Sequence, residues 1–115
     1  MITVADTFKA LGDPVRLEMV QRLASGASYT VGGLSNGLGI TRQGARKHLQ
    51  VLTEAKLITL EPKGRETQVR LDRDSLETAR SFITELERRW DKRLEALRDF
   101  VELEAPVKED STVPA

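Results

Sequence analysis

Apolar residues recur at intervals of three and four over the first part of the chain, the spacing that places them on one face of an α-helix. Val4, Phe8 and Leu11 predict a short first helix. The pair Asp13-Pro14 suits the N-cap and first position of a second helix. The apolar positions of that second helix are Val15, Leu17, Met19, Val20 and Leu23. We expect this broad apolar face to lie at the centre of the core.

Residues 28–56 predict two short helices joined by a tight turn. Thr30 is placed to cap the first of them, over roughly residues 31–37, and Thr41 is placed to cap the second. Three glycines weaken the first helix, so packing against the rest of the protein must hold it. Gly39 lies in the link, where glycine tolerates a positive φ. The second helix has its buried stripe at Ala45, Leu49 and Leu52.

Polar residues of this second helix fall outside the buried stripe, mostly in the first two turns. They are Arg42, Gln43, Arg46, Lys47 and Gln50. A helix with a buried back and an Arg/Gln/Lys front near its N-terminus suits a DNA recognition helix. Arginine can pair with a guanine edge and glutamine with adenine, while ordinary solvation of these side chains is the alternative. Gly44 indicates close approach of either DNA or the preceding helix, and the sequence leaves both open.

The spacing of apolar residues changes to two after residue 56, which is typical of β-strands. Residues 57–60 and 67–71 predict two antiparallel strands, and residues 61–66 predict the turn between them. Lys63 and Arg65 lie near its tip, where they can reach phosphates or a minor groove. A hairpin that follows a helix-turn-helix has the layout of a wing.

A long last helix is predicted over residues 75–103. Its apolar positions are Leu76, Ala79, Phe82, Ile83, Leu86, Trp90, Leu94, Leu97 and Val101. One small core cannot cover so long a face, so we expect it to meet a second copy of the chain. Trp90 is interpreted as an anchor of that dimer, with a small-molecule pocket beside it as the alternative. Residues 1–104 thus form one domain, and residues 105–115, without periodicity, are expected to be a disordered acidic tail.

Charge is distributed unevenly although the 115 residues carry no formal net charge. Residues 41–70 hold seven Lys or Arg against three Glu, a local excess of four positive charges, as a DNA-binding region requires. The chain from residue 99 onward is acidic. Apolar runs are too short to cross a membrane and no secretory start is evident, so we expect a cytoplasmic protein without membrane contact.

Candidate chemistry is sparse. Cysteine is absent and His48 is the only histidine, so no catalytic constellation can be assembled and an enzyme is not expected. We interpret His48 as a packing or phosphate-contacting residue. The acidic residues Asp91, Glu95 and Asp99 recur every four residues and could bind a divalent ion, but they interleave with Arg and Lys, which favours a solvated helix face.

Five segments in order resemble the ArsR family of bacterial winged-helix repressors. They are residues 8–17 (FKALGDPVRL), 38–43 (LGITRQ), 47–52 (KHLQVL), 55–58 (AKLI) and 63–65 (KGR). The resemblance covers about residues 4–100. It implies a mainly α winged helix-turn-helix with a small β-hairpin (α-α-α-α-β-β-α), and a homodimer joined through its first and last helices. It also implies repression at an inverted-repeat operator in double-stranded DNA.

Two departures from the family concern metal. Founding members sense metal through a cysteine-containing segment, where this chain has Thr30-Val-Gly-Gly-Leu34, and others use histidines on the last helix, which has none here. The chain is therefore more similar to the cysteine-free branch, which includes autorepressors, and we expect no metal and no cofactor. A small-molecule effector at the dimer interface and a protein-interaction module without DNA binding are the alternative functions.

Two sets of site residues follow from the pattern and the resemblance together. The predicted DNA-binding residues are Thr41, Arg42, Gln43, Arg46, Lys47, His48, Gln50, Lys63 and Arg65. The predicted dimer-interface residues are Val4, Phe8, Phe82, Ile83, Leu86, Trp90, Leu94 and Leu97.

Overall fold

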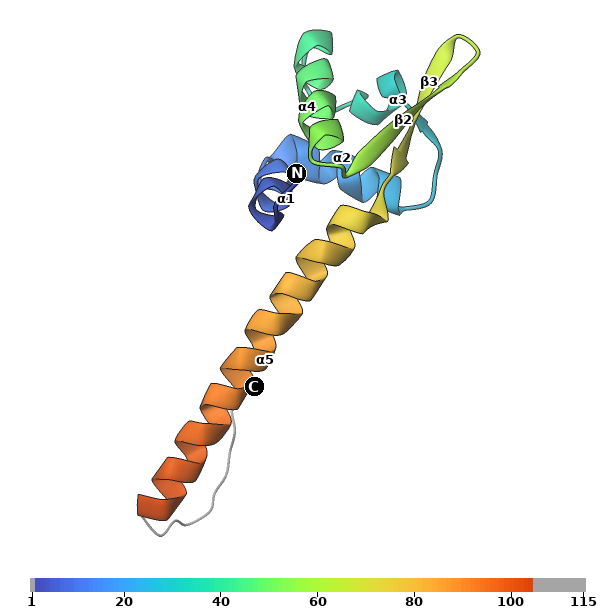
Figure 1. Cartoon of the computed structure of the whole chain (residues 1–115). Helices are drawn as coiled ribbons and strands as arrows, with labels where there is room; N and C mark the ends of the chain where they lie inside the picture. Colours follow the sequence, from blue (N-terminus) through green and yellow to red (C-terminus); the bar gives the residue numbers. More distant parts are fainter. Residues whose placement is uncertain (1, 105–115) are drawn as a thin grey trace. The chain divides into compact units, whose positions relative to one another are not determined.

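A computed structural model describes residues 2–104 and confirms a mainly helical winged helix-turn-helix (Figure 1). The elements are α1 (Val4–Leu11), α2 (Pro14–Ala24), β1 (Tyr29–Thr30), α3 (Val31–Ser35), α4 (Arg42–Glu54), β2 (Ile58–Lys63), β3 (Glu66–Leu71) and α5 (Arg73–Glu104). The chain divides into two compact units, and the division falls within α5, between Phe82 and Ile83.

The core of the first unit is built around α2. Met19, Leu34, Leu52, Leu57 and Ile58 are each at most 1% exposed, and they come from α2, α3, α4, the link after α4 and the start of β2. The central position expected for α2 is therefore confirmed.

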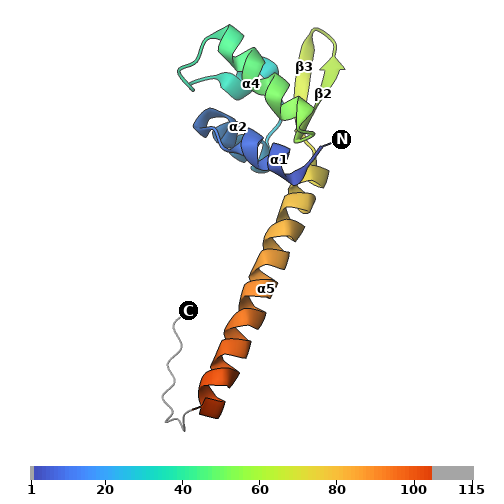
Figure 2. The ribbon, with the colours of Figure 1, turned by 60° about the vertical axis from the view of Figure 1, so that its left-hand side comes forward.

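One residue of the predicted core is wrong. Leu17 on α2 is 44% exposed, because it lies two residues from Met19 and so on nearly the opposite side of the helix. Helix α1 packs beside α2 (Figure 2), and its buried residues are Thr7 and Ala10. Phe8, predicted for the dimer interface, is exposed and lies near Phe82, with ring centroids 6.0 Å apart.

The sheet has a third strand that the sequence did not predict. The two-residue strand β1 pairs antiparallel with β3, and the strand order is β1-β3-β2. The turn predicted over residues 61–66 is wrong, since Lys63 already pairs with Glu66 and only Gly64 and Arg65 form the turn. Gly64 has φ +63°, as the first position of a type II′ turn requires. Pro62 is tolerated because β2 is an edge strand.

Hydrogen bonds at the C-terminal end of α4 terminate that helix and link it to the first turn of α5. Lys56 has φ +61° and follows the C-cap, and the Leu57 N–H donates to the Leu52 carbonyl at 2.9 Å, which closes a Schellman motif. The buried Ser75 hydroxyl donates to the Ala55 carbonyl at 3.0 Å. These bonds position the last turn of α4 and the beginning of α5.

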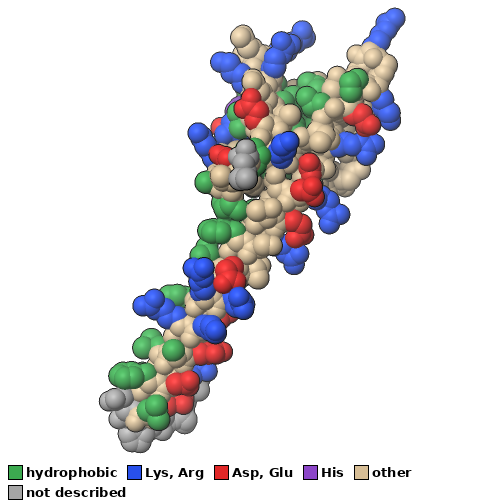
Figure 3. All heavy atoms as spheres, viewed as in Figure 1, with side chains coloured by type: hydrophobic (Ala, Val, Ile, Leu, Met, Phe, Trp, Pro, Cys, Tyr) green, Lys and Arg blue, Asp and Glu red, His purple; other side chains and the backbone are tan. Residues whose placement is uncertain are grey.

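The second unit, from Ile83 onward, is a single helix in the part that the structure describes. Its large apolar side chains are exposed, as the green side chains along one side of α5 show (Figure 3). Trp90, in the middle of the stripe, is 59% exposed. The tail expected over residues 105–115 lies outside the described residues.

Candidate nucleic-acid interface

The turn between α3 and α4 is held by a threonine cap at the start of each helix. The Thr30 hydroxyl accepts from the Gly33 N–H at 3.0 Å, and the Thr41 hydroxyl accepts from the Gly44 N–H at 2.9 Å. Both predicted caps are confirmed. Helix α3 ends at Ser35, two residues earlier than expected, and Gly39 in the turn has φ +70°, as expected for that link.

Gly44 is explained by the cap of its own helix. A Cβ built there would meet the Thr41 hydroxyl oxygen at 3.2 Å and Ile40 Cβ at 3.9 Å. In the described structure its close neighbour is thus the capping hydroxyl and not α3. A side chain at position 44 would therefore require this hydroxyl to shift by a few tenths of an ångström.

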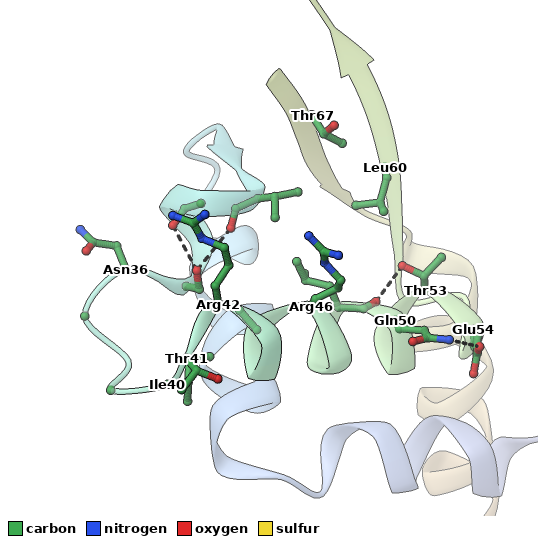
Figure 4. A pocket seen from close by; sticks show the side chains of 17 residues that line it. Asn36, Ile40, Thr41, Arg42, Arg46, Gln50, Thr53, Glu54, Leu60 and Thr67 are labelled. Carbon is green, nitrogen blue, oxygen red and sulfur yellow. Dashed lines mark hydrogen bonds between the residues drawn. The ribbon is translucent and has the colours of Figure 1, made fainter. Parts of the chain in front are cut away.

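The front of α4 is arranged in two rows, while its back is buried as predicted at Ala45, Leu49 and Leu52. Arg42, Arg46 and Gln50 follow one another at four-residue spacing and border a groove that α3 and the β2–β3 hairpin line on its other side (Figure 4). Gln43 and Lys47 form the neighbouring row, outside that groove. All five side chains are exposed. The structure brings them together on one helix, and their DNA contacts stay a prediction.

His48 lies on the side of α4 that faces α2. It is half-buried, and its Nδ1 is 3.1 Å from Nη1 of Arg16. A guanidinium can only donate, so Nδ1 accepts and the ring proton sits on Nε2. Arg16 also donates to the carbonyls of Ala10, at 2.7 Å, and Lys9, at 3.4 Å. One arginine therefore ties the last turn of α1 to the recognition helix.

A second arginine of α2 supports α3. Arg22 Nη1 donates to the Leu34 carbonyl at 3.1 Å and to the Asn36 carbonyl at 2.8 Å, where α3 ends. These bonds help to hold a helix that its glycines weaken. Sequence reasoning missed both Arg16 and Arg22. The available signal was two arginines inside a helix predicted to be central.

The N-terminus of α2 is capped by a carboxylate. Asp13 Oδ1 accepts from the Val15 N–H at 2.8 Å and from the Arg16 N–H at 3.2 Å. These N–H groups, first that of Arg16, lower the pKa of Asp13, because they stabilise the ionised form. The cap orients the helix that carries Arg16.

The hairpin carries its cations at the tip. Lys63 and Arg65 are exposed, and Lys and Arg side chains gather both there and over the start of α4 (Figure 3). Along the hairpin, Arg70 Nε lies 3.0 Å from Glu61 Oε1, in an exposed ion pair of small energetic weight. Exposed Lys and Arg side chains therefore lie at both places that the sequence assigned to DNA, the start of α4 and the hairpin tip.

Residues 2–104 contain no group of three acidic or histidine side chains arranged to hold a metal ion. No helix in the same range is long and apolar enough to cross a membrane.

Comparisons with known proteins agree with this geometry. A family model described as a helix-turn-helix domain matches residues 11–61. Among solved structures, a possible transcriptional regulator for arsenical resistance is 33% identical, with a TM-score of 0.64, over 70% of this chain and 83% of that chain. An ArsR-like transcriptional regulator from Rhodococcus sp. RHA1 is 29% identical, with a TM-score of 0.73, over 84% and 91%.

A third solved structure, the transcriptional repressor BigR from Xylella fastidiosa, is 27% identical, with a TM-score of 0.56, over 70% of this chain and 83% of that chain. The search among curated proteins found no match.

Proposed function

The chain belongs to the ArsR family of winged helix-turn-helix, DNA-binding transcriptional regulators, and from this premise we propose that it is a repressor that binds an inverted-repeat operator as a homodimer. The observation that supports the proposal most is the front of α4. Five exposed polar side chains lie there on a helix that is capped at both ends and buried along its opposite face.

Each predicted DNA-binding residue has a role in this proposal. Arg42 and Arg46 read guanine edges, and Gln43 reads adenine. The remaining residues contact phosphates or, at the hairpin tip, a minor groove; they are Thr41, Lys47, His48, Gln50, Lys63 and Arg65. His48 has only Nε2 left for such a contact, because Nδ1 accepts from Arg16.

The proposed homodimer covers apolar side chains that one chain leaves exposed. Phe8 and Phe82 belong to this set in the first unit, and the stripe from Ile83 to Leu97 belongs to it in the second. A two-fold axis would place two recognition helices in successive major grooves, about 34–36 Å apart.

We further propose that neither metal nor catalysis is involved. The chain has no cysteine, and its one histidine binds an arginine rather than a carboxylate or a nucleophile. Thiolates and imidazoles are frequent ligands of transition metals, and a catalytic nucleophile usually requires a base such as histidine beside it.

The test is selection of bound fragments from the source genome, followed by titration of the selected duplex and of a random duplex. Arg46→Ala should weaken binding of the selected duplex more than binding of the random one, whereas Lys63→Ala should weaken both alike. Equal losses for Arg46→Ala would contradict its base-reading role. Affinity should fall steeply with salt, and a flat salt dependence would favour a protein-interaction module instead.

A further inference from the structure

The groove beside the recognition helix has an apolar floor. Its volume is about 1150 Å³, and α3, the turn, α4 and the β2–β3 hairpin all contribute to it (Figure 4). The apolar residues that line it are Val31, Ile40, Ala45, Leu49 and Leu60. Sites for small organic ligands share this composition, an apolar lining with a few placed polar groups.

Leu60 is the least covered part of that floor. It follows the fully buried Ile58 by two residues on β2, so the two side chains share a face of the strand. Leu60 is nonetheless 44% exposed, although its cross-strand partner Val69 is buried. A DNA phosphate gains nothing from such a side chain, whereas an apolar ligand would remove it from water.

The two ends of the groove carry opposite charges. Arg42 and Arg46 lie one helical turn apart at one end, and within the described range neither has a carboxylate at ion-pair distance. At the other end Glu54 accepts from the Gln50 amide at 3.2 Å. An anionic group is therefore favoured beside the two guanidiniums and disfavoured beside Glu54.

We propose that this groove binds a small amphipathic carboxylate, with the carboxylate on Arg42 and Arg46 and an aromatic or aliphatic body against Leu60, Val31 and Ile40. The ligand covers the arginines that are proposed to read DNA, so ligand and DNA exclude one another. That consequence rests on the proposed function, while the binding of the ligand itself does not.

The first test titrates the full chain with 2-naphthoate and follows calorimetric heat. Saturable binding at one site per chain is expected, and Arg46→Gln and Leu60→Asn should each weaken it about tenfold. Both residues are exposed or partly exposed, so the variants should fold, which circular dichroism checks. Arg80→Gln, which removes an exposed cation of α5 outside the groove, should bind like the unmodified chain.

The neutral isostere 2-naphthamide should bind more weakly than 2-naphthoate. Absence of saturable binding at millimolar 2-naphthoate would overturn the proposal, and so would equal affinity in all three variants.

The second test adds 2-naphthoate to the protein bound to its selected fragment. Release of the fragment, reduced in Leu60→Asn, supports exclusion, and a ternary complex overturns it. If the chain binds 2-naphthoate as described but no genomic fragment, the proposed function fails while the ligand site stands. If the chain binds genomic fragments but not 2-naphthoate, the ligand site is refuted while the proposed function stands.

Discussion

Arg16 on α2 and His48 on α4 form a contact of 3.1 Å between Nη1 and Nδ1, and the same guanidinium binds two carbonyls at the end of α1. The contact joins residues 32 positions apart in the sequence. It sets the position of the recognition helix relative to α1 by polar bonds in addition to core packing.

Arg16→Met should lower the free energy of unfolding by about 1–2 kcal/mol, since it removes charge-assisted bonds while keeping the aliphatic stem. Chemical denaturation at pH 7.5 measures this. Arg98→Met, on the exposed part of α5, is the matched control and should have little effect. A loss no larger than that of the control would show that the three bonds add nothing.

Thr41→Ala should destabilise the chain by about 1 kcal/mol, because the Gly44 N–H loses its acceptor and the first turn of α4 frays. DNA affinity should fall as well, since Arg42 and Gln43 lie in that turn. Thermal unfolding and fragment binding together test this. Thr59→Ala, an exposed threonine of β2, serves as control, and an equal effect of both substitutions would argue against the cap.

Asp13→Asn should change how stability depends on acid. The N–H bonds hold the native pKa of Asp13 below its ordinary value of 3.8, so the ionised carboxylate stabilises the fold at neutral pH. That contribution is lost as the pH falls through the native pKa. Asparagine can cap without ionising, so the variant should lose less stability between pH 6 and about pH 3. Acid titrations of the unmodified chain and of Asp13→Asn, followed by circular dichroism, test this. Superimposable curves would refute the prediction.

Leu94→Glu should shift the proposed homodimer toward monomer, because it places a charge within the exposed apolar stripe of α5. Thr84→Glu adds the same charge to an exposed position outside the stripe and should leave association unchanged. Sedimentation velocity over a range of concentrations separates the two. A chain that is monomeric before substitution would exclude the dimer altogether.

Features with a local signature were predictable from the sequence. The boundaries of α4 follow from a cap hydroxyl at Thr41 and from apolar residues at helical spacing, both of which lie within a few residues of one another. The last helix was found by the same spacing, although it starts at Arg73 rather than Ser75.

Features that depend on distant partners were missed. The strand β1 is two residues long and exists only because β3 pairs with it. The turn of the hairpin was overestimated because Pro62 suggests a loop, whereas an edge strand accepts it. Arg16 and Arg22 donate to groups on other elements, and no periodicity within α2 reports such bonds.

The contact between Thr41 and Gly44 makes these two positions evolutionarily interdependent. A Cβ at position 44 would lie 3.2 Å from the Thr41 hydroxyl oxygen, so with the cap in place Gly44→Ala requires that exposed hydroxyl to shift by a few tenths of an ångström. Once position 41 has lost its hydroxyl, the same alanine is accommodated and benefits from its higher helix propensity. The effect of Gly44→Ala thus depends on which residue occupies position 41, which is epistasis set by a single hydrogen bond.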